Sequence, residues 1–204
     1  MKKIKDKLIT IYPQLIFLIV TFCIFMPSSL FLGNIDQFAV GFAALIPLLM
    51  AASLITAAVV ILIGLIVPKK ICNIYAAVIF GGALAAYVQG NFLNPDFGVL
   101  NGRQIQWSQF KVNGIISTVV WIVLIVVPPV IVCFKKDIMT NIIKWGSLFL
   151  SSIQVVTLVV LIVSSKRSVD YSYVVTKNDE FALSSQGNVV VFIVDTLDNE
   201  DAQN

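Results

Sequence analysis

Five long stretches without a charged residue constrain this chain more than any other feature. No Asp, Glu, Lys or Arg occurs in residues 8–35, 37–68, 71–95, 112–134 or 145–165. An α-helix needs about 20 apolar residues to cross about 30 Å of hydrocarbon, and every stretch is long enough. Charged residues make up only 12% of the 204 residues, about half the fraction typical of a soluble domain. The sequence therefore predicts an all-α polytopic membrane domain and excludes a soluble globular domain.

We expect residues 1–165 to form a five-helix transmembrane domain. The predicted transmembrane helices cover about residues 8–32, 40–67, 71–88, 112–134 and 142–163. The first follows a lysine-rich start, as a signal peptide does. Its apolar part is longer than the 7–15 residues of a signal-peptide core, and no Ala-x-Ala cleavage pattern follows it. We therefore interpret it as a retained helix, with Pro27 kinking its far end.

The distribution of basic residues predicts the orientation. If the amino terminus is cytoplasmic, the inner segments carry lysines 2, 3, 5, 7, 69, 70, 135, 136 and 144. The outer segments then carry only Arg103, Lys111, Lys166, Arg167 and Lys177. Because short cytoplasmic loops are enriched in Lys and Arg, we expect a cytoplasmic amino terminus and an extracytoplasmic carboxyl terminus. Seven of the eleven acids follow Ser165, whereas the basic residues cluster earlier, beside the apolar stretches. This distribution of basic residues favours anionic lipid headgroups over nucleic acid as a partner.

The predicted spans carry few polar groups. No Asp, Glu or Arg falls within them, and ion or proton pathways generally need such groups, so a pump is disfavoured. We expect Gln154 and Asn73 to hydrogen-bond between helices rather than to bind a ligand. Small residues at a four-residue spacing, Gly81 with Ala85 and Gly82 with Ala86, predict close helix packing.

The segment between the third and fourth spans alternates aromatic and polar residues. Phe92, Phe97, Trp107 and Phe110 lie among glycines, asparagines and glutamines, a composition typical of a loop at the outer membrane surface. An interfacial loop is the simpler interpretation. The sharper hypothesis is a substrate-binding role in which this loop guides a lipid headgroup, with Trp107 nearby and Arg103 contacting a phosphate.

A buried β-strand is predicted near the carboxyl terminus. Residues 189–194 are all β-branched or aromatic, and Asn188 and Asp195 flank them. Such a run is typical of a parallel strand that is buried on both faces. It needs neighbouring strands, which the 39 residues 166–204 cannot supply. We therefore interpret 166–204 as an extracytoplasmic linker followed by the first strand of a truncated α/β domain.

Asp195 directly follows this predicted strand. Ligands of open α/β sheets bind beyond the carboxyl ends of the strands, where a carboxylate suits a divalent cation. Asp195 followed by Thr196 is an equally good helix amino cap. From the pattern alone the two roles remain open.

The whole arrangement resembles one family. Five amino-terminal spans followed by Asn188-Val-Val-Val-Phe-Ile-Val-Asp195 resemble the membrane-anchored sulfatase-like enzymes of the alkaline phosphatase superfamily, which include lipoteichoic acid synthases and related phosphoglycerol transferases. Gln89-Gly-Asn-Phe-Leu-Asn94 and Phe181-Ala-Leu-Ser184 are also similar to bacterial members of that group. The resemblance covers the amino-terminal membrane region and implies a location in the bacterial cell membrane.

The resemblance implies a metal-dependent transferase or hydrolase of cell-envelope polymer synthesis. It makes Asp195 one ligand of a divalent metal, manganese or calcium, expected only in a full-length enzyme. No catalytic residue can be assigned, because the family's nucleophile and remaining ligands lie further downstream and this chain has no His. We therefore expect the fragment to be inactive.

A second function remains open, namely a standalone five-span structural or accessory protein without catalysis. A reading frame continuing past Asn204 into a Thr or Ser nucleophile and an Asp–His pair would support the enzyme.

Overall fold

Five long apolar helices form the part of the chain that the structure describes. The computed structural model describes residues 2–35, 38, 40–95 and 107–165. Within these residues, five helical segments are long and apolar enough to cross a membrane, and none forms a strand. The protein is therefore a multi-pass membrane protein, as the charge-free stretches predict.

Several helical segments are built from more than one element. The first span comprises α1 (Lys2–Leu18), the π-helix η1 (Ile19–Phe25) and α2 (Met26–Gly33), and the second comprises the 3₁₀-helix η3 (Phe42–Leu45) and α3 (Ile46–Ile66). The third comprises the 3₁₀-helix η4 (Lys69–Ile71), α4 (Cys72–Val88) and the π-helix η5 (Gln89–Leu93). The fourth comprises the 3₁₀-helix η6 (Trp107–Phe110) and α5 (Lys111–Phe134), and the fifth is α6 (Lys136–Ser164).

The fifth helix begins earlier than the expected position near residue 142. A single non-helical residue, Lys135, separates α5 from α6, and its backbone N–H donates to Ile131 O at 2.8 Å. Asp137 in the first turn of α6 favours the helix there through the positive end of the helix dipole. The Thr140 hydroxyl donates to Lys136 O at 2.6 Å. Two polar turns therefore extend the helix beyond its apolar stretch.

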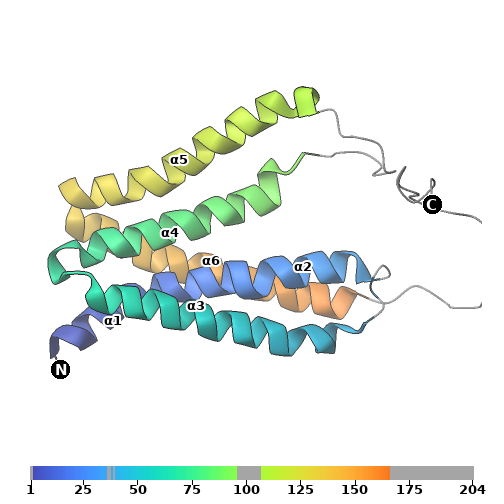
Figure 1. Cartoon of the computed structure of the whole chain (residues 1–204), viewed down its shortest axis with the longest axis horizontal. Helices are drawn as coiled ribbons and strands as arrows, with labels where there is room; N and C mark the ends of the chain where they lie inside the picture. The colour runs from blue at the N-terminus through green and yellow to red at the C-terminus, as the bar shows by residue number, and fades with distance from the viewer. Residues whose placement is uncertain (1, 36–37, 39, 96–106, 166–204) are drawn as a thin grey trace, which may run out of the picture. The chain divides into compact units, whose positions relative to one another are not determined.

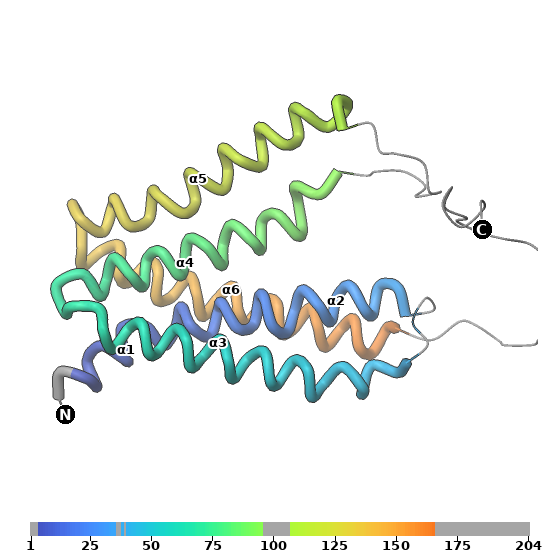
Figure 2. Tube along the Cα trace, in the orientation of Figure 1, coloured from blue at the N-terminus to red at the C-terminus, as the bar shows by residue number. Residues whose placement is uncertain are grey.

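Helices α1 and α4 form the centre of the bundle. Figure 1 and Figure 2 show α4 running beside α5, while α1 packs against α3, α4 and α6. The most apolar windows of the first and third spans are 44% buried, against 11% for those of the second and fourth. The core is one cluster around Phe17, Phe80 and Ile143 and a second around Ile11 and Ile79. The Phe17 and Phe80 rings lie 5.8 Å apart, centre to centre.

The outward faces of α3, α5 and α6 are covered with exposed aliphatic side chains. Examples are Leu54, Ile115 and Val156, of which 63–69% of the surface is exposed. A soluble protein rarely exposes an apolar surface of this extent, whereas lipid chains cover it without cost. These faces therefore lie against hydrocarbon in the membrane.

A π-helical stretch, η1, lies directly before Met26 and Pro27, the position at which the sequence predicts a kink. In η1 the backbone hydrogen bonds shift register, and the Met26 N–H donates to Thr21 O. The Thr21 hydroxyl and the Gln154 carboxamide, both fully buried, exchange hydrogen bonds of 3.1 and 3.0 Å. This pair joins η1 to α6 and confirms the interhelical role expected for Gln154.

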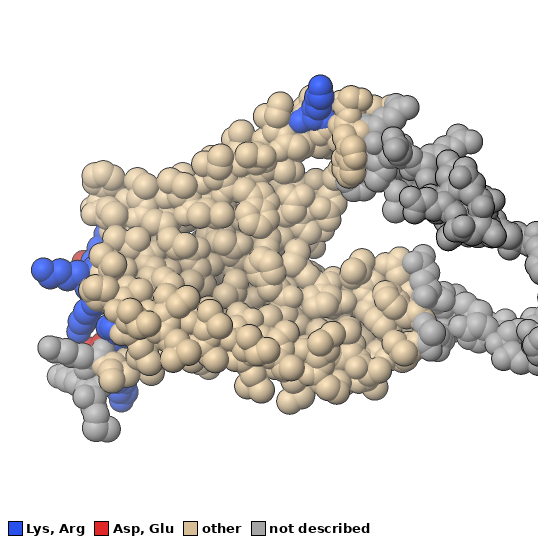
Figure 3. All heavy atoms as spheres, in the orientation of Figure 1, with Lys and Arg blue, Asp and Glu red and all other residues tan. Residues whose placement is uncertain are grey.

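Lysines gather at one end of the bundle, where α1, α4 and α6 begin. Figure 3 shows these basic side chains there. We call it the basic end; its described members are Lys5, Lys7, Lys69, Lys70, Lys135, Lys136 and Lys144. Lys69 Nζ lies 2.8 Å from Asp6 Oδ2, and Lys7 Nζ donates to Leu65 O at 2.8 Å. At the opposite end, the described residues include a single charged side chain, that of Lys111.

The small residues of α4 differ in what they allow. A Cβ added at Gly81 would collide with the backbone of α5 at Leu124 O and would lie 3.0 Å from Ile125 Cα. A Cβ added at Gly82 meets nothing within 4 Å. Only Gly81 therefore lets α4 approach α5 closely.

Replacing Gly81 with alanine should loosen the packing of α4 on α5. We expect Gly81→Ala to lower the free energy of unfolding by about 1–3 kcal/mol, because backbone atoms must move to admit the methyl group. Thermal unfolding in detergent micelles measures this. The matched control Gly82→Ala should be neutral or slightly stabilising, because alanine favours the helix. Equal effects of the two substitutions would contradict the assigned contact.

Candidate functional site

The structure describes one of the three site residues that the sequence predicts. Trp107 begins η6, directly before α5, and 66% of it is exposed. It is not among the residues that line the polar pocket between α2 and η5. Arg103 and Asp195 lie outside the described residues, as does the predicted strand 189–194 with the whole segment 166–204.

A polar pocket of about 410 Å³ lies between α2 and η5 at the end opposite the basic end. Figure 3 shows the hollow that separates these two parts of the bundle. The lining residues are Phe25, Met26, Ser29, Leu30, Asn34, Gly90, Asn91 and Asn94. None of these described residues is charged, and half of them carry a hydroxyl or a carboxamide. The pocket is therefore neutral but rich in hydrogen-bonding groups.

Three of the lining side chains donate a hydrogen bond to a backbone carbonyl. Asn34 Nδ2 donates to Leu30 O at 2.9 Å, and Asn91 Nδ2 donates to Tyr87 O at 2.7 Å. The Ser29 hydroxyl donates to Met26 O at 3.0 Å. Each of these side chains thus uses one donor hydrogen on the backbone of its own helix. Among the described residues, none donates to the carboxamide oxygen of Asn34 or Asn91.

Gln89 holds the wall of this pocket in place. Its Nε2 donates to Asn94 Oδ1 at 3.1 Å, and its Oε1 accepts a hydrogen bond from Trp121 Nε1 at 3.1 Å. Trp121 lies on α5, so the two bonds tie η5 to the neighbouring helix. Trp121 therefore positions the asparagines of η5 although it does not line the pocket.

Irregular turns border the pocket on both sides. Phe25 ends the π-helix η1, and Gly90 and Asn91 lie within the π-helix η5. A Cβ at Gly90 would lie 2.7 Å from Met26 Cε, the flexible end of a side chain on the facing wall. Single π-helical turns inside α-helices occur frequently at functional sites. Their position on both walls supports a binding role for this pocket.

The described residues do not fit a metal site. Among them, no three His, Cys, Asp or Glu side chains lie together. A hard divalent cation prefers several carboxylate or carbonyl ligands in one cavity. The neutral oxygens of the pocket instead suit a ligand that donates hydrogen bonds, such as one with hydroxyl groups.

Comparison with protein-family models, with curated proteins and with solved structures finds no match for this chain.

The sequence reasoning missed the partners of the 89–94 segment. It singled out that segment but did not pair it with Ser29 and Asn34 of the first span. The signal was present, because Asn34 and Asn94 both follow spans that end on the same side of the bundle. Membership of a common pocket depends on which helices are neighbours, and the sequence pattern does not supply this.

Replacing Trp121 with phenylalanine should release η5. The variant keeps an aromatic side chain but removes the indole N–H that donates to Gln89 Oε1, and loss of this hydrogen bond costs about 0.5–1.5 kcal/mol. We expect amide hydrogen exchange of residues 89–94 to quicken by roughly three- to tenfold in detergent micelles. The control Trp145→Phe removes an indole that is 64% exposed and lies next to Lys144 of the basic end. It should leave the exchange of 89–94 unchanged, and an equal response to both variants contradicts the role of Trp121.

Proposed function

We propose that this chain is the membrane domain of a sulfatase-like enzyme that acts outside the cytoplasm on cell-envelope polymers. Its reaction is phosphoglycerol or phosphoethanolamine transfer, or the related hydrolysis. The pocket between α2 and η5 receives the headgroup of a lipid substrate. The observation that carries this proposal is the neutral, oxygen-lined pocket at that end of the bundle.

The path of the chain supports this assignment. Helix α6 begins at the basic end and ends at Ser164, on the side of the membrane where η5 also ends. The described chain therefore reaches Ser165 on the membrane face at which the pocket lies, and Asp195 follows later in the sequence. A catalytic domain attached there has access to a lipid headgroup in the same leaflet. Asp195 is the residue we propose as a metal ligand in a full-length enzyme.

The chemistry of the lining supports a hydroxyl-bearing headgroup. A glycerol headgroup donates hydrogen bonds through its hydroxyls, and the oxygens of Asn34 and Asn91 accept them. The apolar members Phe25 and Leu30 suit the adjoining part of a lipid. Arg103, on the segment that follows η5, is the proposed contact for the phosphate.

The clustering of lysines supports a cytoplasmic basic end. In this orientation the amino terminus is cytoplasmic, and the pocket opens toward the outer leaflet of the bacterial cell membrane.

Cysteine labelling tests the orientation. In a background with Cys23, Cys72 and Cys133 replaced by alanine, Asn94→Cys should react with a membrane-impermeant maleimide in intact cells. Lys135→Cys, the matched position at the basic end, should react only after the membrane is permeabilised. The reverse labelling pattern overturns the orientation.

Lipid binding tests the pocket. The chain is placed in phosphatidylcholine nanodiscs, and a short-chain fluorescent phosphatidylglycerol is titrated against it. We expect the double substitution Asn34→Ala with Asn91→Ala to weaken binding by about tenfold, because two acceptors of about 0.5–1.5 kcal/mol each are lost. The change in fluorescence anisotropy measures the affinity.

A third asparagine provides the control for lipid binding. Asn113 lies on α5 at the same end, is exposed, and does not line the pocket. Asn113→Ala should bind the probe as the unchanged chain does. Equal losses in both variants, or equal affinity for a fluorescent phosphatidylcholine, would argue against a headgroup pocket.

A further inference from the structure

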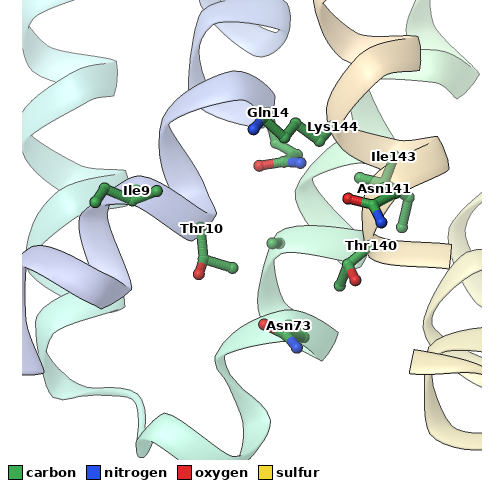
Figure 4. A pocket seen from close by; sticks show the side chains of 9 residues that line it. Ile9, Thr10, Gln14, Asn73, Thr140, Asn141, Ile143 and Lys144 are labelled. Carbon is green, nitrogen blue, oxygen red and sulfur yellow. The ribbon is translucent and has the colours of Figure 1, made fainter. Parts of the chain in front are cut away.

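A second polar cavity, of about 260 Å³, lies at the basic end and is separate from the proposed headgroup pocket. Figure 4 shows Thr10 and Gln14 from α1, Asn73 from α4, and Asn141 and Lys144 from α6 around one space. The complete lining is Ile9, Thr10, Gln14, Asn73, Ala76, Thr140, Asn141, Ile143 and Lys144. Three helices thus contribute polar groups to one cavity.

Three residues of the cavity lining are almost fully buried. Ala76 is 2% exposed and Ile143 is 1% exposed, and Ile143 belongs to the core cluster around Phe17. Gln14 is also 2% exposed. With its amide oriented to suit the surrounding groups, Gln14 Nε2 donates to Thr10 O at 2.7 Å and to Ile11 O at 3.2 Å. Gln14 is therefore held in place by the backbone of α1.

The hydrogen-bond donors of the cavity divide into two sets. The Thr10 and Thr140 hydroxyls donate to backbone carbonyls of their own helices, at 3.0 and 2.6 Å. Within the described residues, the side chains of Asn73, Asn141 and Lys144 donate no hydrogen bond, so the interhelical bond expected for Asn73 is not formed there. The Lys144 ammonium forms a cation–π contact with the Trp145 ring, whose centre lies 5.4 Å from Nζ. Two amides and one ammonium thus remain able to donate into the cavity.

The charge of the lining is positive. Lys144 is its charged member, and no Asp or Glu is among the described lining residues. Asp6, a nearby acid at this end, forms an ion pair with Lys69 on the exposed surface. A cation with flanking amide donors in an acid-free cavity is suited to an oxyanion, and lysine binds phosphate as a point charge. Basic pockets between transmembrane helices bind phosphate-bearing lipid headgroups.

We propose that this cavity binds a phosphate group, with Lys144 supplying the charge and Asn73 and Asn141 supplying hydrogen bonds. The phosphate belongs to an anionic lipid of the adjacent leaflet or to a soluble phosphate ester. In either case binding links α4 and α6 through one ligand. The proposal does not depend on the function of the pocket at the opposite end.

Thermal stabilisation in nanodiscs tests this site. The unfolding midpoint of the whole chain is measured in phosphatidylcholine alone, with added phosphatidic acid, and with inorganic phosphate in the buffer. We expect a saturable rise with at least one phosphate source. A rise with phosphatidic acid alone identifies a lipid ligand, whereas a rise with inorganic phosphate identifies a soluble one. No rise with either overturns the proposal.

Three lysine variants separate a specific site from general attraction of the basic end. Lys144→Gln should weaken the effective affinity for phosphate by about tenfold, and Lys144→Arg should retain most of it. Lys136→Gln removes the same charge from the same end but lies outside the cavity lining, and it should change the affinity less than twofold. Equal weakening by Lys136→Gln and Lys144→Gln overturns the proposal, because surface charge alone then explains binding. Should Lys144→Gln fail to fold, Asn141→Ala serves in its place, with a smaller loss expected.

Discussion

Hydrocarbon offers no hydrogen-bond partner to a polypeptide, and every feature of this bundle depends on that constraint. The chain pairs its backbone N–H and C=O groups within long helices, and it departs from α-helical geometry in a few places. Before Pro27, which has no backbone N–H to donate, the π-helix η1 shifts the bonding register. The adjoining Thr21 hydroxyl pairs with Gln154, so the irregular segment is joined to α6 by buried hydrogen bonds. Irregularity and side-chain pairing thus occur together.

Polar side chains are concentrated at three depths of the bundle, and each set has a different character. The buried Thr21–Gln154 pair is complete in itself, which suits a purely structural role. The pocket between α2 and η5 presents carboxamide and hydroxyl oxygens without charge. The cavity at the basic end combines Lys144 with amide donors. The two ends of one helical bundle are therefore equipped for chemically different ligands, neutral and hydroxyl-rich at one and anionic at the other.

Packing around α4 connects these regions. Its Gly81 face lies against α5, its Phe80 lies in the core with Phe17 of α1, and its first turn contributes Asn73 to the basic cavity. Its continuation, η5, forms one wall of the opposite pocket and is held by Trp121. A single helix thus contributes to both polar sites, and its small residues allow the neighbouring helices to approach closely.

The sequence by itself determined the class of protein, because the length of each charge-free stretch matches the bilayer and leaves no alternative for the backbone. It also identified Gln154 as an interhelical group, since an amide in hydrocarbon needs a partner. Only the tertiary structure decided that this partner is Thr21, that Gly81 rather than Gly82 carries the close contact, and that Asn34 meets the 89–94 segment. Helical periodicity shows which residues share a face, but the choice of neighbouring helix depends on how side chains of distant segments fit together.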